Sequence, residues 1–225
     1  LPNHEWLEAT IAQMKSTFNL DNGQQSYVSF SQNEDLRGLN YFSRLYEVIA
    51  SHQVVSLQYH KFTGEAWERL VHPYQLRQYN NRWFLVGWEP AVAAKIPLVV
   101  IPLDRIDDYT VLEKESYEPY EGDIDACFKD IVGVSLKFNE FCSHIVFKAY
   151  PPTSSYIETK PIHHSQRIVE RHEDYTIFSL DLIPNYEFET IMMSYADNCE
   201  ILEPQDLKES LVCRAKNIIK FNVGQ

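Results

Sequence analysis

From residue 54 to residue 112 the apolar positions follow a period of two, and no helical pattern interrupts them. Because successive side chains of a strand point to opposite faces, this pattern predicts a series of strands, most of them with one buried face. The expected strands are residues 54–59, 67–73, 83–88, 97–103 and 106–112. Several short strands joined by turns, with no helix between them, predict a small antiparallel barrel.

The first two strands are expected to form a hairpin with its turn at residues 63–65. Tyr59 shares one face of the first strand with Val55 and Leu57. On the second strand, which should end at a proline, the shared face consists of Trp67, Arg69 and Val71. The third strand is a near-continuous apolar run, so both of its faces are expected to be buried.

Helical spacing of apolar residues predicts two helices before the strands. The first covers about residues 4–18 and has its apolar residues on one face. The second begins near residue 39, and its expected apolar stripe consists of Leu39, Phe42, Leu45, Tyr46 and Ile49. Neither helix carries a catalytic signature, so packing against a sheet or a partner chain is the expected role.

An acidic segment rich in turn formers, residues 117–122, is the best candidate for a domain boundary. Beyond it we expect a short helix at 123–131 and an extended stretch at 134–138. Strands are expected at 144–150, 163–171, 175–183 and 199–202. Helices are expected from 151 and around Phe188, Ile191, Met192 and Tyr195. Pro204 should open a last helix, with Leu207, Leu211, Ile218 and Ile219 on its apolar side.

From residue 144 to residue 202 the expected order is β-α-β-β-α-β, the ferredoxin-like arrangement. The sequence therefore predicts an α+β protein in three parts. Residues 1–38 form a helical linker segment, residues 39–116 a small Sm-like or SH3-like antiparallel barrel, and residues 117–225 a ferredoxin-like domain.

The chain is strongly acidic, with a net charge of −12, which argues against broad, nonspecific binding to nucleic acid. A small local basic pocket is compatible with that charge. No run of about twenty apolar residues predicts a membrane span, and no signal peptide is visible at the start. The four cysteines show no C-x-x-C spacing. We therefore expect a reduced, cytoplasmic protein with free thiols.

The sequence contains no recognisable catalytic, metal or cofactor motif. It has no H-E-x-x-H, G-x-S-x-G, G-x-G-x-x-G or P-loop pattern, and the adjacent His163 and His164 would point to opposite faces of a strand. We expect no enzymatic activity, no metal ion and no cofactor.

Several motifs resemble the WYL domain, a ligand-sensing module of bacterial transcription regulators. The kernel is Arg82–Trp88, in which Trp83-Phe84-Leu85 stands for the name-giving triplet with Phe where the family usually has Tyr. Tyr59, the run 69–73 and the run 103–106 (Leu-Asp-Arg-Ile) match in the family's order.

The second half resembles the extension that commonly follows the WYL domain. The matching pieces are Ser165-Gln166, Tyr195-Ala196-Asp197 and the run 201–204, Ile-Leu-Glu-Pro. The family usually has Gly near Asp197, so the turn there should differ. The two resemblances together cover about residues 39–222.

The resemblance implies a binding pocket for an anionic effector in the barrel, such as a nucleotide or a single-stranded nucleic acid. Carried over by position, its lining includes Tyr59, Arg69 and Arg105. Many family members carry a further Arg where this chain has Val99. His72, Arg82 and Lys95 are the candidates to replace it.

In family members a winged helix-turn-helix domain and a helical linker precede the WYL domain. No helix-turn-helix is recognisable here, and the sequence starts at Leu1 rather than Met. The resemblance therefore implies a DNA-binding domain upstream of Leu1, with residues 4–18 in the linker, and a homodimer. The alternative is a non-sensing oligomerisation or interaction module, which the valine at position 99 favours.

Overall fold

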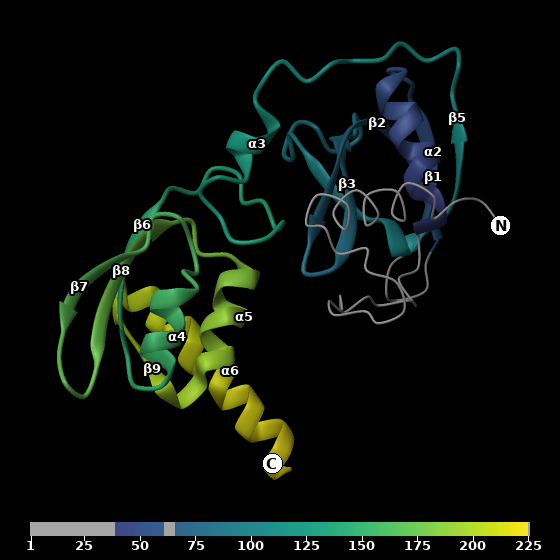
Figure 1. The fold of residues 1–225 in the computed structure, drawn as a ribbon. Coiled ribbons are helices and arrows are strands. Elements are labelled where there is room, and N and C mark those ends of the chain that lie inside the picture. The colour runs from purple at the N-terminus through teal and green to yellow at the C-terminus, as the bar shows by residue number, and fades with distance from the viewer. Residues whose placement is uncertain (1–38, 61–65, 225) are drawn as a thin grey trace, which may run out of the picture. The chain divides into compact units, whose positions relative to one another are not determined.

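The computed structural model describes residues 39–60 and 66–224, which divide into two compact units, one up to Glu121 and one from Gly122 onward. Each unit combines helices with its own antiparallel sheet, so the architecture is α+β (Figure 1). The helix predicted at residues 4–18 and the turn predicted at 63–65 lie outside the described residues. No helix in the described part of the chain is both long and apolar enough to cross a membrane.

The described part of the first unit contains one helix, five strands and one 3-10 turn. These are α2 (Leu39–Ala50), β1 (Val55–His60), β2 (Ala66–Tyr79), β3 (Arg82–Trp88), β4 (Val99–Pro102), η1 (Leu103–Arg105) and β5 (Ile106–Val111). The strand order across the sheet is β4-β3-β2-β1-β5, and every neighbouring pair is antiparallel.

The core of the first unit lies between α2 and the sheet. Val55, Leu57 and Tyr59 are all buried, which confirms the face predicted for β1. On α2, Leu45 and Val48 are buried, whereas Tyr46 is 63% exposed. The prediction that Tyr46 belongs to the apolar stripe was wrong, because one residue is a rotation of about 100° around the helix axis, which turns this side chain away from the core.

The prediction that β2 ends at Pro73 was wrong, since the strand continues to Tyr79. The pairing with β3 shifts register between Pro73 and Gln75, which marks a bulge. Proline has no N–H to donate to a ladder and is tolerated at such a bulge. Opposite Pro73 lies Gly87, where a Cβ atom would stand 2.6 Å from the carbonyl oxygen of His72. The bulge and the glycine together let the two strands approach closely.

The second unit contains four strands, four helices and one 3-10 turn. These are α3 (Ile124–Cys127), β6 (Ser143–Ala149), α4 (Thr153–Thr159), β7 (Arg167–Arg171), β8 (Thr176–Leu182), α5 (Tyr186–Tyr195), η2 (Ala196–Asn198), β9 (Cys199–Glu203) and α6 (Gln205–Val223). The strand order is β7-β8-β6-β9, again with antiparallel neighbours.

One face of the second sheet is buried, since Ile145, Phe147 and Ala149 alternate with partly exposed residues along β6. The rings of Phe147 and Phe178 stack with centroids 5.3 Å apart at the centre of this core. Helix α5 begins after the buried Asn185, whose side-chain oxygen accepts a hydrogen bond from the Phe188 N–H at 2.9 Å. This bond caps the helix, as asparagine commonly does.

Two predicted elements are shorter than expected by four residues or more. The helix predicted at 123–131 stops at Cys127, where the N–H groups of Phe128 and Lys129 bond only three residues back, to the carbonyls of Asp125 and Ala126, and close the last turn. The strand predicted to begin at residue 163 begins only at Arg167, since the His163 ring is engaged in a hydrogen bond to the Lys129 carbonyl.

The apolar side predicted for α6 is only partly buried. Leu207 is 4% exposed, whereas Ile218 and Ile219 are 52% and 61% exposed. The predicted stripe therefore exists, but the second half of the helix extends beyond the core that its first half helps to form.

Replacing Gly87 by Ala should destabilise the first unit by about 1–3 kcal/mol, because the added methyl group would overlap the His72 carbonyl and the Val71 side chain. All four tryptophans lie before residue 122, so tryptophan fluorescence during urea unfolding follows this unit alone. Phe147→Ala, in the core of the second unit, is the control and should leave that fluorescence transition unchanged. An unaltered midpoint for Gly87→Ala would contradict the close approach of β2 and β3.

Candidate functional site

The structure brings three of the residues predicted for a binding site together in the first unit. The guanidinium carbon of Arg69 lies 5.2 Å from the centroid of the Tyr59 ring, and that of Arg105 lies 4.7 Å from the same centroid. Both distances are in the range of cation–π contacts. We call Tyr59, Arg69 and Arg105 the Tyr59 cluster.

Strand register explains why Arg69 reaches Tyr59. Tyr59 pairs with Trp67 and Leu57 pairs with Arg69, so Arg69 is the diagonal cross-strand neighbour of Tyr59 on the same face. Diagonal neighbours of this kind lie within reach of long and aromatic side chains. The face predicted for β1, which includes Tyr59, and the face predicted for β2, which includes Arg69, thus lie on the same side of the sheet.

Arg105 reaches the ring from the other side of β1. It is the last residue of η1 and directly precedes Ile106, the partner of Tyr59 on β5. The β1–β5 register shifts between Gln58 and Tyr59. Such irregularities re-aim the side chains beside them. The Arg105 Nε also donates a hydrogen bond of 3.1 Å to the carbonyl oxygen of His60, which fixes the side chain at this position.

A carboxylate that the sequence reasoning missed completes the surroundings. Arg69 donates from Nε to Oε2 of Glu89 at 3.0 Å and from Nη2 to the same oxygen. Glu89 is only 7% exposed. The signal in the sequence was a charged residue directly after the apolar strand β3. The register of β2 and β3 sets His72 opposite Trp88. Glu89 directly follows Trp88, so it comes level with Val71, which shares a strand face with Arg69.

The Tyr59 cluster has the chemistry of an anion site. Guanidinium groups offer several donors in a fixed plane that suits phosphate and carboxylate oxygens, and Tyr59 adds a ring that an aromatic ligand can contact. Tyr59 itself is 8% exposed, so little of it reaches solvent. The arrangement can bind an anion, and it contains no group arranged as a nucleophile or general base.

The other predicted site residues have their contacts elsewhere. Arg82 donates two bonds of 2.8 Å to Asp104, and its guanidinium lies over the ring of Phe84. Lys95 is exposed on the turn before β4. Val99 is 5% exposed and belongs to the hydrophobic core. In this chain the position of the missing arginine is therefore part of the packing.

His72 is buried and anchors the segment that follows the five-stranded sheet. Its Nδ1 accepts a hydrogen bond of 3.0 Å from the Glu118 N–H, and its ring packs edge-on against Trp88. The Tyr117 hydroxyl donates to the carbonyl of Pro73, and the Tyr74 hydroxyl donates to that of Glu118. Burial lowers the pKa of His72 and raises that of Tyr74 to about 12. Both groups are therefore neutral at pH 7.

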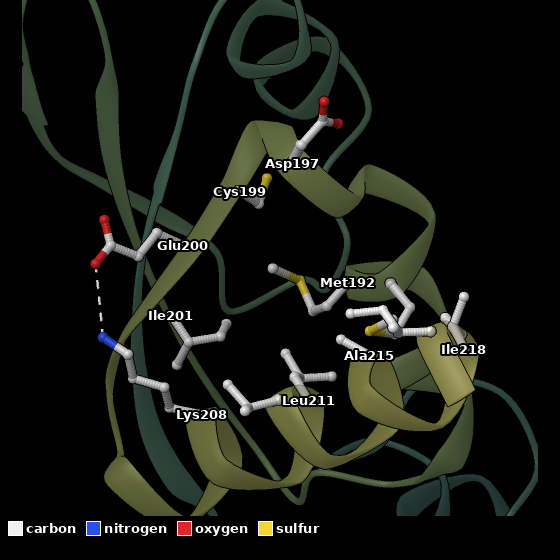
Figure 2. A pocket seen from close by; sticks show the side chains of 12 residues that line it. Met192, Asp197, Cys199, Glu200, Ile201, Lys208, Leu211, Ala215 and Ile218 are labelled. Atoms are coloured by element: carbon white, nitrogen blue, oxygen red, sulfur yellow. Dashed lines mark ion pairs between the residues drawn. The ribbon is translucent and has the colours of Figure 1, made fainter. Parts of the chain in front are cut away.

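A groove in the second unit, of about 480 Å³, is a separate candidate site (Figure 2). Its walls are apolar, and Figure 2 shows Met192, Ile201 and Leu211 facing the hollow from α5, β9 and α6. Charged residues stand at its edge, where Glu200 and Lys208 form an ion pair of 3.5 Å. Burial raises the pKa of the Cys199 thiol to about 12, so this thiol is a poor nucleophile. The groove is suited to apolar contacts.

No site for a metal ion is found in residues 39–60 and 66–224, since they hold no group of three or more His, Cys, Asp or Glu side chains placed around one point. All four cysteines are free.

Comparison with known families and structures follows the division into two units. Residues 40–111 match the model of the WYL domain, and residues 143–219 match that of the WCX domain. No curated protein matches the sequence significantly.

Two solved structures resemble the chain at low sequence identity. A CRISPR Cas-related protein is 12% identical, with a TM-score of 0.50 over 82% of this chain and 53% of its own. The proteasome accessory factor B/C (PafBC) of Arthrobacter aurescens is 16% identical, with a TM-score of 0.38 over 95% of this chain and 32% of its own. The chain thus spans about half of the length of the CRISPR Cas-related protein and about a third of the length of PafBC. The likeness to the CRISPR Cas-related protein is one of fold.

The burial of His72 predicts a pH dependence of the first unit's stability. Because the folded protein holds the pKa of His72 below its ordinary value of 6.5, its neutral form stabilises the fold above that pH. As the pH falls below 6.5, His72 binds a proton more readily in the unfolded chain than in the folded chain. The free energy of unfolding should then drop by up to about 1.4 kcal/mol per pH unit.

Tryptophan-monitored urea unfolding between pH 7.5 and pH 5 measures this loss. His72→Asn, which keeps a hydrogen-bond acceptor, should flatten the dependence. His163→Asn is the matched control, since burial also lowers the pKa of His163 but this residue lies in the unit without tryptophan. An equally steep loss in wild type and His72→Asn would show that His72 is not the titrating group.

Proposed function

Because this chain is a WYL-domain protein in which a WCX domain follows the WYL domain, we propose that it is the ligand-sensing part of a bacterial WYL-type transcriptional regulator. The observation that carries the proposal is the convergence of two guanidinium groups on the ring of Tyr59. The role is one of binding and regulation, without a catalysed reaction.

We assign the first unit to the Sm-like barrels and the second to the ferredoxin-like folds. In support of the first assignment, β1 lies between β2 and β5, and consecutive strands β2, β3 and β4 follow outward from it. In support of the second, the order β7-β8-β6-β9 occurs together with helices after the first and third strands of the sheet.

The proposed effector carries an anionic group, as a nucleotide or a single-stranded nucleic acid does. Its phosphate would be held by Arg69 and Arg105, and a base would contact Tyr59. The net charge of −12 opposes the approach of any polyanion. We therefore expect weak binding, on the order of micromolar, that falls as salt rises.

Binding would act on transcription through parts that precede the barrel. We propose a DNA-binding domain upstream of Leu1 and a linker in residues 1–38, so that duplex DNA is bound through that domain alone. A ligand can shift the placement of linker and barrel only if its affinity differs between the two arrangements. The effector would thus favour one arrangement of the DNA-binding domains in a homodimer.

Replacing Arg69 or Arg105 by Ala should weaken binding of a fluorescein-labelled oligo(dT) by about 1.5–3 kcal/mol, or roughly 10- to 150-fold, because a charged hydrogen bond is lost. Arg69→Lys should restore binding only in part, since the bidentate geometry is absent. Fluorescence anisotropy at low salt measures the affinity.

Arg82→Ala is the matched control for these variants. It removes the same charge from the same unit, but this guanidinium is paired with Asp104 and lies over the ring of Phe84. It should change the affinity by less than about threefold, the scale of general surface electrostatics. If all three alanine variants lose affinity equally, overall charge and not the Tyr59 cluster governs binding.

A second candidate function, an oligomerisation module, is favoured by the exposed apolar side of α6. Val212, Ile218 and Ile219 border the groove of Figure 2 and are each about half exposed. Beyond Glu209 the helix carries only basic charges, including Lys216 and Lys220, whereas Asp197 and Glu200 stand at the groove. A second copy of this chain offers both an apolar surface and complementary charge.

Light scattering after size exclusion tests this second function. Ile219→Asp should convert a dimer to a monomer, because a carboxylate would be buried among apolar groups. Val169→Asp is the control, since Val169 is similarly exposed but lies on β7, outside the groove. A monomeric wild type, or a dimer that survives Ile219→Asp, would exclude this surface. A dimer that binds no anion would favour the module over the sensor.

A further inference from the structure

Arg69 is engaged before any ligand arrives. Its Nε and Nη2 both donate to Oε2 of Glu89, and the side chains of the pair are 19% and 9% exposed. Charges so far removed from water interact more strongly, and are screened less by salt, than a pair on the surface. An anion that binds Arg69 therefore meets a carboxylate already in contact with that arginine.

We infer that Glu89 sets the selectivity of the Tyr59 cluster by competing with the ligand's anionic group for Arg69, which restricts the site to phosphate-bearing ligands and excludes simple carboxylates. The inference rests on the proposed function, because it presumes that the cluster binds an anion. Glu89 is a specificity-determining residue in this account and does not itself hold the ligand.

The competition follows from tethering. The Glu89 carboxylate is attached to the chain and faces Arg69 at hydrogen-bond distance, so its effective concentration there far exceeds that of any free carboxylate. A free carboxylate offers the same chemistry as Glu89 and gains nothing by replacing it. A phosphate monoester carries more negative charge and three acceptor oxygens, so it can contact Arg69 and Arg105 together.

Another carboxylate–arginine pair in the described part of this unit provides the comparison. Arg82 and Asp104 also form a two-bond pair, but Arg82 lies over the ring of Phe84, and the pair is more exposed, at 35% and 27%. Neutralising Asp104 changes the charge of the protein by the same amount as neutralising Glu89. If the Glu89 variant changes the selectivity and the Asp104 variant does not, the effect comes from the position of Glu89 and not from the net charge.

Phenyl phosphate and benzoate are suitable probes, because each joins one aromatic ring to one anionic group. Isothermal titration of the whole chain should show binding of phenyl phosphate and no measurable binding of benzoate. Glu89→Gln should increase the affinity for phenyl phosphate about tenfold and make benzoate binding measurable, since the competing charge is gone while the side-chain size is kept. Asp104→Asn should leave the wild-type preference unchanged.

Glu89→Asp covers the case in which Glu89→Gln does not fold, since its carboxylate remains but is one methylene further from Arg69. It should relax the preference in the same direction by a smaller factor. In folded variants, phenyl phosphate should raise the thermal unfolding midpoint of Glu89→Gln more than that of wild type, because tighter binding stabilises the folded state more.

The outcomes separate this inference from the proposed function. If wild type binds phenyl phosphate but the Glu89 variants keep its preference over benzoate, Glu89 does not set selectivity although the cluster is an anion site. The inference also fails if Asp104→Asn changes the preference as much as Glu89→Gln. If neither wild type nor any variant binds phenyl phosphate, both the inference and the anion site are wrong.

Discussion

The placement of two guanidinium groups against one buried tyrosine ring is the constraint around which the first unit is arranged. Arg69 comes to Tyr59 through the β1–β2 register, and Arg105 comes to it through the irregular pairing of β1 with β5. Charged groups at the edge of an apolar core need polar partners. Glu89 supplies one for Arg69, and the His60 carbonyl supplies one for Arg105. The same contacts thus fix the two arginine side chains in place and offset the cost of removing their charge from water.

The acidity of the chain gives this small basic cluster its significance. With a net charge of −12, the protein as a whole repels polyanions, and a local concentration of arginines opposes that repulsion. The second unit offers a different chemistry, an apolar groove beside a half-exposed helix. The arginine cluster in one unit and the apolar groove in the other are the basis of our proposal of a regulator that senses with one part and assembles with the other.

Much of the fold could be predicted because periodicity reports which face of an element is buried. The shared face of Tyr59 with Val55 and Leu57, and the order of elements in the second half, follow from spacing alone. What spacing cannot provide is a contact between distant residues. The bond from the Glu118 N–H to His72, and the bond from His163 to the Lys129 carbonyl beside the delayed start of β7, each join residues more than thirty positions apart.

The candidate site shows the same limit. Tyr59, Arg69 and Arg105 could be chosen from residue type and resemblance, but their convergence depends on strand register. Glu89 was missed because a charge after an apolar strand ordinarily faces solvent. Whether the cluster binds an anion stays a prediction. A crystal structure grown with a 5′-phosphorylated oligothymidylate tests it most directly. The account predicts a phosphate within hydrogen-bond distance of both Arg69 and Arg105, whereas a phosphate bound elsewhere, with the Arg69–Glu89 pair intact, would contradict it.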